Sequence, residues 1–279
     1  MPRLASASGL LLSFPPETLL LFALSGVVSG TIDAIAGGGG LIALPVLLLG
    51  GLDPASAVAT NKLQGTLGTA TATARFARAG LLDLRAAETW GLAASSFAGS
   101  ILGALCIAFA PIHVMRVGLP FLLIAVALYF AFGPRMSDID VTARLSPRAF
   151  ALCAALPIGF YDGLFGPGAG SFFMIAIVGL AGLGALRAVA RTKLLNLASN
   201  VASLLVFLAA GTIVWSAGLA MAAGAFVGAR IGSALALKHG VGLVKPLLVV
   251  VALALALRLM LDSSHPVGAA LRALTGASA

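Results

Sequence analysis

The sequence predicts an all-α polytopic membrane protein of about ten membrane segments, short half-helices included, arranged as two inverted repeats. The first observation is composition: the 279-residue chain is 60% hydrophobic and only 9% charged, with a mean hydropathy of +1.10. Soluble domains carry about 25% charged residues, so this chain cannot cover a water-facing surface, and a soluble enzyme or nucleic-acid-binding domain is excluded. The other two observations are the lengths of the uncharged runs and an internal duplication.

The uncharged runs set the order and length of the expected segments. The longest run, 194–229, has 36 residues. As one helix it would measure about 54 Å, whereas a bilayer core is about 30 Å thick, so a turn is expected near Gly211. Two segments are too short to cross easily and are expected to be half-helices that either cross or re-enter, namely 40–51 and 169–182. The other expected segments are 18–35, 55–78, 86–110, 114–133, 148–165, 186–209, 214–237 and 242–261.

An ordered series of residues in the first half of the chain recurs in the second half. Asp33 and a glycine run, Gly37–Gly40, are echoed by Asp162 and Gly166–Gly170, and a polar, basic segment follows each of them. The series predicts two repeats joined by a basic linker. The expected organisation is an N-terminal segment 1–17, a first membrane repeat 18–133, a cytoplasmic linker 134–147, a second membrane repeat 148–261 and a C-terminal tail 262–279.

The basic residues indicate how the repeats are oriented. The net charge of +8 is scattered over short loops, where it fixes topology and does not indicate nucleic acid. The number of membrane crossings depends on how each half-helix is treated. If a half-helix and the helix before it together make two crossings or a re-entrant hairpin, most basic residues fall on one side of the membrane. That side is then cytoplasmic, both termini lie outside, and the repeats are inverted. The basic residues on that side are Arg75, Arg78, Arg85, Arg135, Arg144, Arg148, Arg187, Arg191, Lys238 and Lys245.

Segments 55–78 and 186–209 carry too many polar residues to face lipid. Lys62 and Lys193 each lie about 11–12 Å along their helices, which brings both amines near the bilayer midplane. Polar groups at that depth usually face a cavity or each other, although a lysine can also snorkel to the headgroups. We therefore expect a substrate site that includes Thr60, Asn61, Lys62 and Gln64 from the first segment, and Thr192, Lys193, Asn196 and Asn200 from the second.

The two glycine runs are expected to break helices. Each glycine costs about 1 kcal/mol in a helix interior, so four in succession do not form a regular helix. A break here would place main-chain amides at the N-terminus of a half-helix, where anions bind. Discontinuous helices around a midplane site are typical of secondary transporters. The expected anion-binding glycines are Gly38, Gly39, Gly40, Gly166, Gly168 and Gly170.

Asp33 and Asp162 precede the two breaks, and three roles are open to them. They could balance the charge of the lysines, carry protons, or cap the following turn. No metal site and no cofactor are expected, and Cys106 and Cys153, which lie in apolar runs, are expected to be buried thiols. Neither a phosphate-binding GxxxxGK[ST] loop nor a nucleophile–base pair occurs, so we expect neither an ATP-driven pump nor an enzyme.

Several of these motifs resemble those of a known family. Gly37–Pro45, Gly51–Pro54 and Ala59–Lys62 resemble the first-repeat signature of the TauE/SafE sulfite-exporter (TSUP) family, and Asp162–Gly170 resembles its second-repeat signature. The resemblance covers about residues 18–261. It implies a permease of the bacterial inner membrane for sulfite, thiosulfate or small organosulfonates such as sulfoacetate.

The expected function is therefore a secondary transporter, specifically an exporter, that works by alternating access at a midplane site between the repeats. An anion channel, or a permease for another small carboxylate or oxyanion, is the alternative. The expected partners are the small sulfur anion and the lipid bilayer, with no nucleic acid, and a homodimer is left open. The identity of the anion, the direction of transport and the coupling ion are also left open by the sequence.

The inverted arrangement makes a topological prediction. A cysteine introduced at Leu82 should react with a membrane-impermeant thiol reagent only from the cytoplasm, and one introduced at Thr212 only from outside. Accessibility labelling of spheroplasts and inverted vesicles measures this directly. Reaction of both positions from the same face would contradict the inversion.

Overall fold

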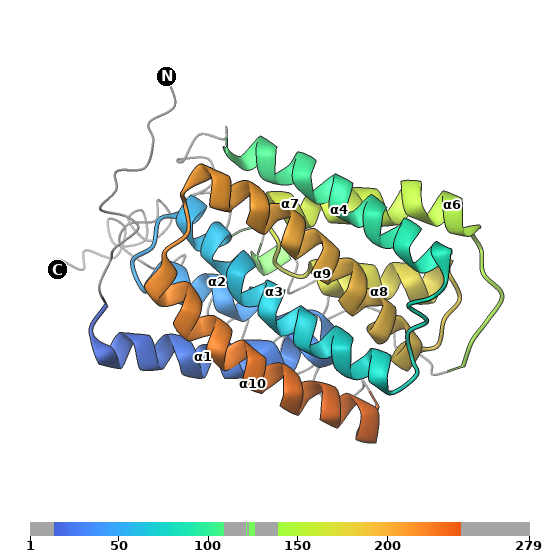
Figure 1. Ribbon diagram of the computed structural model, residues 1–279, viewed down its shortest axis with the longest axis horizontal. Coiled ribbons are helices and arrows are strands. Elements are labelled where there is room, and N and C mark those ends of the chain that lie inside the picture. Colours follow the sequence, from blue (N-terminus) through green and yellow to red (C-terminus); the bar gives the residue numbers. More distant parts are fainter. Residues whose placement is uncertain (1–13, 109–120, 122, 126–138, 241–279) are drawn as a thin grey trace, which may run out of the picture.

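The computed structural model describes residues 14–108, 121, 123–125 and 139–240, and within these residues every regular element is a helix (Figure 1). The expected segment 242–261 and most of 114–133 lie outside the described residues. The helices are α1 (Pro16–Ala36), α2 (Gly40–Leu49), α3 (Pro54–Arg78), α4 (Ala87–Ala108), α6 (Pro147–Phe150), a π-helical segment (Ala151–Ala155) that continues into α7 (Leu156–Leu164), α8 (Ala169–Leu180), α9 (Ala185–Ala210) and α10 (Trp215–His239).

The lengths and composition of the helices confirm the predicted multi-pass membrane protein. Four helices are long and apolar enough to cross a membrane, namely α1, α4, α9 and α10. The apolar helices α2 and α8 have only 10 and 12 residues. They span about 15–18 Å, roughly half of a bilayer core, as expected for half-helices.

The polar helices α3 and α9 begin and end where local signals favour it. Asp53 caps α3, since its Oδ1 accepts hydrogen bonds from the main-chain nitrogens of Ala55 and Ser56 at 3.1 and 3.2 Å. Beyond the other end of α3, Gly80 has φ +75°, and Gly211 closes α9 with φ +65°. Glycine adopts this left-handed conformation without a steric penalty, which makes it the preferred residue after a helix.

The sequence-equivalent helices α3 and α9 run in opposite directions through the interior. Phe76 near the end of α3 belongs to one apolar cluster with Val189 near the start of α9. Val58 near the start of α3 belongs to another cluster with Phe207 near the end of α9. Equivalent helices that run antiparallel are the relation expected between inverted repeats.

The two halves of the chain are interlocked along their glycines. Helix α10 of the second half packs along α1 of the first, and α4 of the first half packs along α7 of the second, at opposite edges of the molecule (Figure 1). In each contact, glycines of one helix lie against main-chain carbonyls of the other, so the backbones are nearly in contact. The glycines are Gly224, Gly228 and Gly232 on α10, which lie against α1, and Gly99 and Gly103 on α4, which lie against α7.

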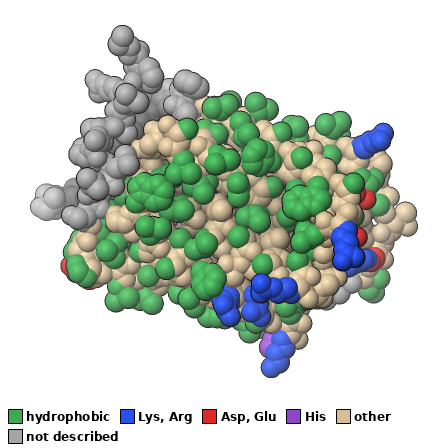
Figure 2. All heavy atoms as spheres, viewed as in Figure 1, with side chains coloured by type: hydrophobic (Ala, Val, Ile, Leu, Met, Phe, Trp, Pro, Cys, Tyr) green, Lys and Arg blue, Asp and Glu red, His purple; other side chains and the backbone are tan. Residues whose placement is uncertain are grey.

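The outer surface fits a lipid environment. Figure 2 shows apolar side chains over most of one face and Lys and Arg gathered toward one end. At that end Arg191 at the start of α9 pairs with Glu88 at the start of α4, with 3.1 Å between Nη1 and Oε1. Arg187 pairs with Asp140 of the linker. Arg187 and Arg191 thus lie in the first two turns of α9, and Arg75 and Arg78 lie in the last turn of α3.

Two sequence expectations about single residues are wrong. Cys106 and Cys153 are exposed, not buried. An apolar run in a membrane protein can face either lipid or protein, so its composition does not fix which side a thiol takes. The structure also bears on the labelling experiment proposed above. Leu82 is only 7% exposed, so the exposed Asp83 is the better position for the introduced cysteine.

Close glycine packing predicts a sharp contrast between two alanine substitutions on α4. A Cβ at Gly99 would overlap the carbonyl oxygen of Leu156, whereas a Cβ at Gly91 would meet nothing within 4 Å. Gly99→Ala should therefore destabilise the protein by about 1–3 kcal/mol through overpacking. Gly91→Ala should stabilise it slightly, by up to about 1 kcal/mol, because alanine favours the helix. Thermal unfolding of the purified variants in detergent measures both, and equal melting temperatures would contradict the packing argument.

Candidate functional site

Both predicted glycine breaks interrupt helices, and the breaks touch each other. Helix α1 ends at Ala36 and α2 begins at Gly40, with Gly37 at φ +78° between them. In the second half, Gly166 and Gly168 adopt φ +95° and +78° just before α8. A Cβ built on Gly170 would lie 2.7 Å from the Cα of Gly37, so any side chain there would push the breaks apart.

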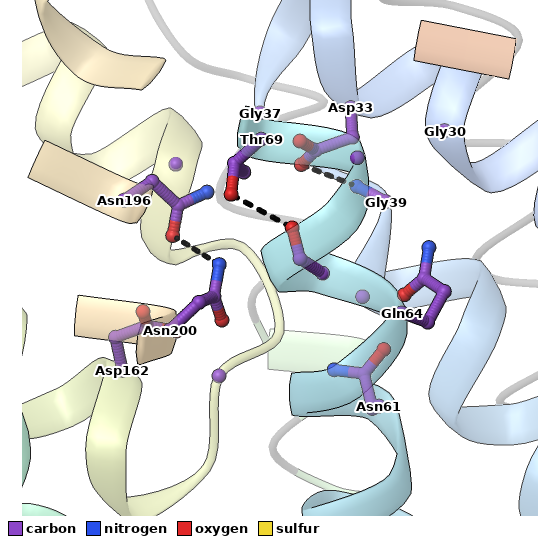
Figure 3. Close-up of a pocket in the computed structure, with 15 residues that line it drawn as sticks. Gly30, Asp33, Gly37, Gly39, Asn61, Gln64, Thr69, Asp162, Asn196 and Asn200 are labelled. Atoms are coloured by element: carbon purple, nitrogen blue, oxygen red, sulfur yellow. Dashed lines mark hydrogen bonds between the residues drawn. The ribbon is translucent and has the colours of Figure 1, made fainter. Parts of the chain in front are cut away.

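A small polar cavity lies beside the breaks, between α3 and α9 (Figure 3). Its volume of about 30 Å³ is room for about two water molecules. Both halves of the chain contribute helices and a break to its wall. The lining residues are Gly30, Asp33, Gly37, Gly39 and Gly40 from α1 and its break, Asn61, Gln64, Gly65, Gly68 and Thr69 from α3, Asp162, Gly166 and Gly170 from α7, its break and α8, and Asn196 and Asn200 from α9.

Every carboxamide side chain of the protein lines this cavity. The 279 residues include three asparagines, Asn61, Asn196 and Asn200, and a single glutamine, Gln64, and all four belong to the wall. Two are held in place: Gln64 Nε2 donates to Ser29 Oγ at 3.0 Å, and Asn200 Nδ2 donates to Asn196 Oδ1 at 3.3 Å. Polar side chains are costly at membrane depth, so their concentration at one place makes this cavity the candidate functional site.

Two ion pairs flank the cavity, and each joins the two halves of the chain. Lys62 Nζ on α3 lies 2.7 Å from Asp162 Oδ1 on α7, and Lys193 Nζ on α9 lies 3.1 Å from Asp33 Oδ2 on α1. Each ammonium also donates to the main-chain carbonyl of its aspartate. Both lysine side chains are 0% exposed, so neither snorkels to the surface. We call these contacts the crossed ion pairs.

The crossed ion pairs differ in how firmly the carboxylate is held. Asp162 receives a further hydrogen bond on Oδ2 from the hydroxyl of Ser199, and its side chain is 3% exposed. Asp33 receives only a long bond from the main-chain nitrogen of Gly39, at 3.3 Å, and its side chain is 15% exposed. Asp33 thus combines pairing with capping of the break, and it is the more open of the two carboxylates (Figure 3).

The structure brings most of the predicted site residues to the cavity wall but leaves some behind it. The lysines stand behind the carboxylates and do not line the cavity. Thr60 Oγ1 accepts a hydrogen bond from Val214 N at 3.0 Å, which ties α3 to the start of α10. The predicted residues that line the cavity are Gly39, Gly40, Asn61, Gln64, Gly166, Gly170, Asn196, Asn200, Asp33 and Asp162, and those that do not are Gly38, Thr60, Lys62, Gly168, Thr192 and Lys193.

Five lining residues were absent from the predicted site. Gly65 and Thr69 follow Lys62 by three and seven residues on the same helical face, which was the available signal. Gly65 makes room for Asn200, whose Oδ1 would lie 3.2 Å from a Cβ there. The full set is Gly30, Gly37, Gly65, Gly68 and Thr69.

Two buried oxygens immediately before the lysines lack hydrogen-bond partners. They are Asn61 Oδ1, in the cavity wall, and Thr192 Oγ1, and the two residues hold equivalent positions in the two halves. Buried polar atoms are nearly always paired, so an unpaired one in a cavity wall suits a ligand. No group of three metal-ligating side chains occurs among the described residues.

The site as a whole carries balanced charge and many neutral hydrogen-bonding groups. Two ammoniums and two carboxylates cancel, while the carboxamides, the Thr69 hydroxyl and the main chain of Gly40 and Gly170 at the starts of α2 and α8 line the cavity. The Thr69 hydroxyl already donates to the carbonyl of Gly65. Such a wall suits a small ligand with several oxygen atoms.

The chain is similar to membrane proteins over most of its length. The sequence model of the family described as Sulfite exporter TauE/SafE matches residues 22–259. The chain is 49% identical to the probable membrane transporter protein ORF9 of a Sinorhizobium species, over 86% of this chain and 91% of the relative. It is 42% identical to the probable membrane transporter protein YfcA of Escherichia coli K12, over 85% and 87%. A probable membrane transporter protein of Haemophilus influenzae is 40% identical, over 85% and 92%. No solved structure matches the chain.

The crossed ion pairs predict strong coupling between their partners. Lys62→Met leaves the Asp162 carboxylate buried without its ammonium and should destabilise the protein by about 3–5 kcal/mol. The double variant Lys62→Met/Asp162→Asn removes both charges and should recover most of that loss. The same cycle at the more exposed pair of Glu88 and Arg191 is the matched control, with an expected coupling of about 0–1 kcal/mol. Melting temperatures in detergent measure both cycles, and additive effects at Lys62 and Asp162 would contradict the pairing.

Proposed function

The chain belongs to the TauE/SafE sulfite exporter family, and we propose from this premise that it exports small sulfur-containing anions across the bacterial inner membrane. The coarser statement, that it is a multi-pass membrane transporter, follows from the family and the helices. The anions proposed are sulfite, thiosulfate and small organosulfonates such as sulfoacetate. The observation that carries the proposal is the placement of all four carboxamides of the chain in one cavity between two helix breaks.

The chemistry of the cavity wall supports this class of anion. Sulfite and sulfonate groups present three oxygens on one sulfur atom, and each oxygen can accept more than one hydrogen bond. Carboxamide N–H₂ groups and the free main-chain amides of a half-helix N-terminus donate from several directions at once. The apolar bulk of the protein would not hold such an ion, because an unpaired charge is strongly disfavoured there.

The size of the cavity supports alternating access. The cavity has room for about two water molecules, so a larger organosulfonate such as sulfoacetate would bind only if the breaks part. The breaks belong to opposite halves, and Gly37 and Gly170 lie in close contact where they meet. A rocking motion of one half against the other would open the cavity toward one side of the membrane at a time.

The alternative function is an anion channel or a permease for a different small oxyanion. A carrier and a channel differ in a measurable way, because a carrier saturates and shows counterflow of labelled substrate against unlabelled substrate. Reconstituted protein in liposomes should show both properties with one of the proposed sulfur anions. Linear, non-saturating flux would favour the channel.

Binding of the anion is predicted to depend on cavity side chains and not on similar residues elsewhere. Asn200→Ala should weaken binding by about 10- to 150-fold, since a hydrogen bond to a charged group contributes about 1.5–3 kcal/mol. Calorimetry on purified protein with a panel of sulfite, thiosulfate, sulfate, sulfoacetate and taurine measures the affinities.

Two threonines on α3 provide a matched comparison in the same assay. The hydroxyls of Thr69 and Thr71 both donate to the carbonyl four residues earlier, at 2.7 and 2.8 Å, but only Thr69 lines the cavity. Thr69→Ala should reduce affinity, and Thr71→Ala should leave it unchanged. Failure of every anion in the panel to bind wild-type protein would refute the proposed function.

A further inference from the structure

We propose that the cavity binds its anion together with a proton, and that Asp33 is the residue that receives this proton. The inference rests on the proposed function, since it concerns the same cavity, and adds the ion with which the anion is coupled. It is carried by the charge of the cavity wall, by the unequal environments of the two aspartates, and by the position of Lys193 behind Asp33.

The charge of the wall does not favour an anion in the described state. Two carboxylates line the cavity, whereas both ammoniums are fully buried behind them and each is paired with one of them. An anion that entered would meet like charges with no free positive charge to compensate it, and such an arrangement is disfavoured at low dielectric. Binding therefore requires the loss of one negative charge from the wall.

Protonation of an aspartate achieves this without any new cation. A like charge nearby favours the neutral form of a carboxyl group, so an entering anion promotes uptake of a proton. When Asp33 becomes neutral, its partner Lys193 keeps a full positive charge beside the cavity. The positive charge of Lys193 then compensates the negative charge of a monovalent anion. With Asp33 neutral, the net charge of the site is again zero.

The structure assigns the proton to Asp33 and not to Asp162. Asp162 is held on both oxygens, by Lys62 and by the hydroxyl of Ser199, and is nearly inaccessible. Asp33 is 15% exposed and has no hydroxyl donor. The hydroxyl donor is present in one repeat and absent at the equivalent position of the other. Ser199 lies six residues after Lys193, and the residue six positions after Lys62 is Gly68.

Among the described residues, Lys193 is the charged side chain that forms an ion pair with Asp33. The two helices that pack against α1 near it also carry Arg75 and Arg78 in the last turn of α3 and Arg187 and Arg191 in the first two turns of α9. Lys193 from α9 faces it directly, and across the cavity stand Asp162 from α7 and its partner Lys62 from α3. Helices α2 and α8 contain no titratable residue. On α10, which packs along α1, the charged residues are Arg230, Lys238 and His239, and all three are exposed.

Coupling of this kind makes transport of a monovalent anion electrically neutral. One anion and one proton move together, so the membrane potential neither drives nor opposes the step. Net flux then follows the product of anion and proton activities on the two sides, and export requires an outward anion gradient large enough to exceed any inward proton gradient.

The test is the number of protons taken up per anion bound by the full-length purified protein. The probe is methanesulfonate, a small organosulfonate that carries one negative charge at every pH used. Titration calorimetry at one pH in two buffers of different ionisation enthalpy gives the proton count. We expect about one proton per anion in the wild type, and an affinity that falls about tenfold for each unit rise in pH.

Three variants locate the proton. In Asp33→Asn the count should fall to about zero, binding should persist, and the affinity should no longer change with pH. Asp33→Asn/Lys193→Met lacks both charges of the pair, so it should bind methanesulfonate much more weakly than Asp33→Asn and take up no proton. Binding by this double variant at wild-type affinity would contradict the role of Lys193. Asp83→Asn, at an exposed aspartate outside the cavity, is the control and should behave as the wild type.

The outcomes separate this proposal from the one on which it rests. Binding by the wild type with no proton uptake, or binding that requires Na⁺ at constant pH, would overturn proton coupling and leave the anion transporter standing. Proton uptake that persists in both Asp33 variants would overturn the assignment to Asp33. Absence of binding by methanesulfonate and by every anion of the panel would instead overturn the proposed function.

Discussion

The rest of the structure depends on the burial of two lysines and two aspartates at its centre. An unpaired charge at that depth would cost several kcal/mol, so each ammonium must meet a carboxylate with good geometry. The partners come from opposite halves, Lys62 with Asp162 and Lys193 with Asp33, which requires the halves to interlock closely. The glycine contacts of α10 with α1 and of α4 with α7 allow this, because main chains can approach where no Cβ intervenes.

The helix breaks serve the same centre in two ways. Near the end of each broken helix a buried ammonium donates to a main-chain carbonyl, Lys62 to that of Asp162 and Lys193 to that of Asp33. The Asp33 carbonyl also accepts from the main-chain nitrogen of Gly37, which closes α1. The half-helix that follows begins with main-chain amides whose dipoles favour negative charge, and the amide of Gly39 before α2 donates to the Asp33 carboxylate. One interruption of the chain therefore provides an acceptor for a lysine and a donor for an anion within a few residues.

Much of this could be predicted from the sequence, because the relevant constraints are local. Clustered glycines predict the breaks, and the short apolar segments 40–51 and 169–182 predict α2 and α8. Polar residues in otherwise apolar segments predict that α3 and α9 are interior helices. The crossed pairing could not be predicted, since its partners are 100 and 160 residues apart in the chain. For the same reason the lysines were expected in the cavity wall, whereas their carboxylates separate them from it. Glycines such as Gly65 and Gly68 line the cavity only because a helix from the other half faces them.

The two repeats place equivalent lysines and aspartates at the centre of the protein, but the two aspartates have different neighbours. A perfectly symmetrical site would hold both carboxylates with equal strength, and neither would change its state before the other. Serine at 199 and glycine at 68 remove that equality, because the hydroxyl fixes Asp162 while the glycine leaves space beside the cavity. The firmly held pair then keeps the two halves together, and the open pair at Asp33 is the one that can respond to a ligand. One hydroxyl group, that of Ser199, therefore makes the two aspartates of a duplicated fold differ in how firmly they are held. The surrounding helices need not change for this.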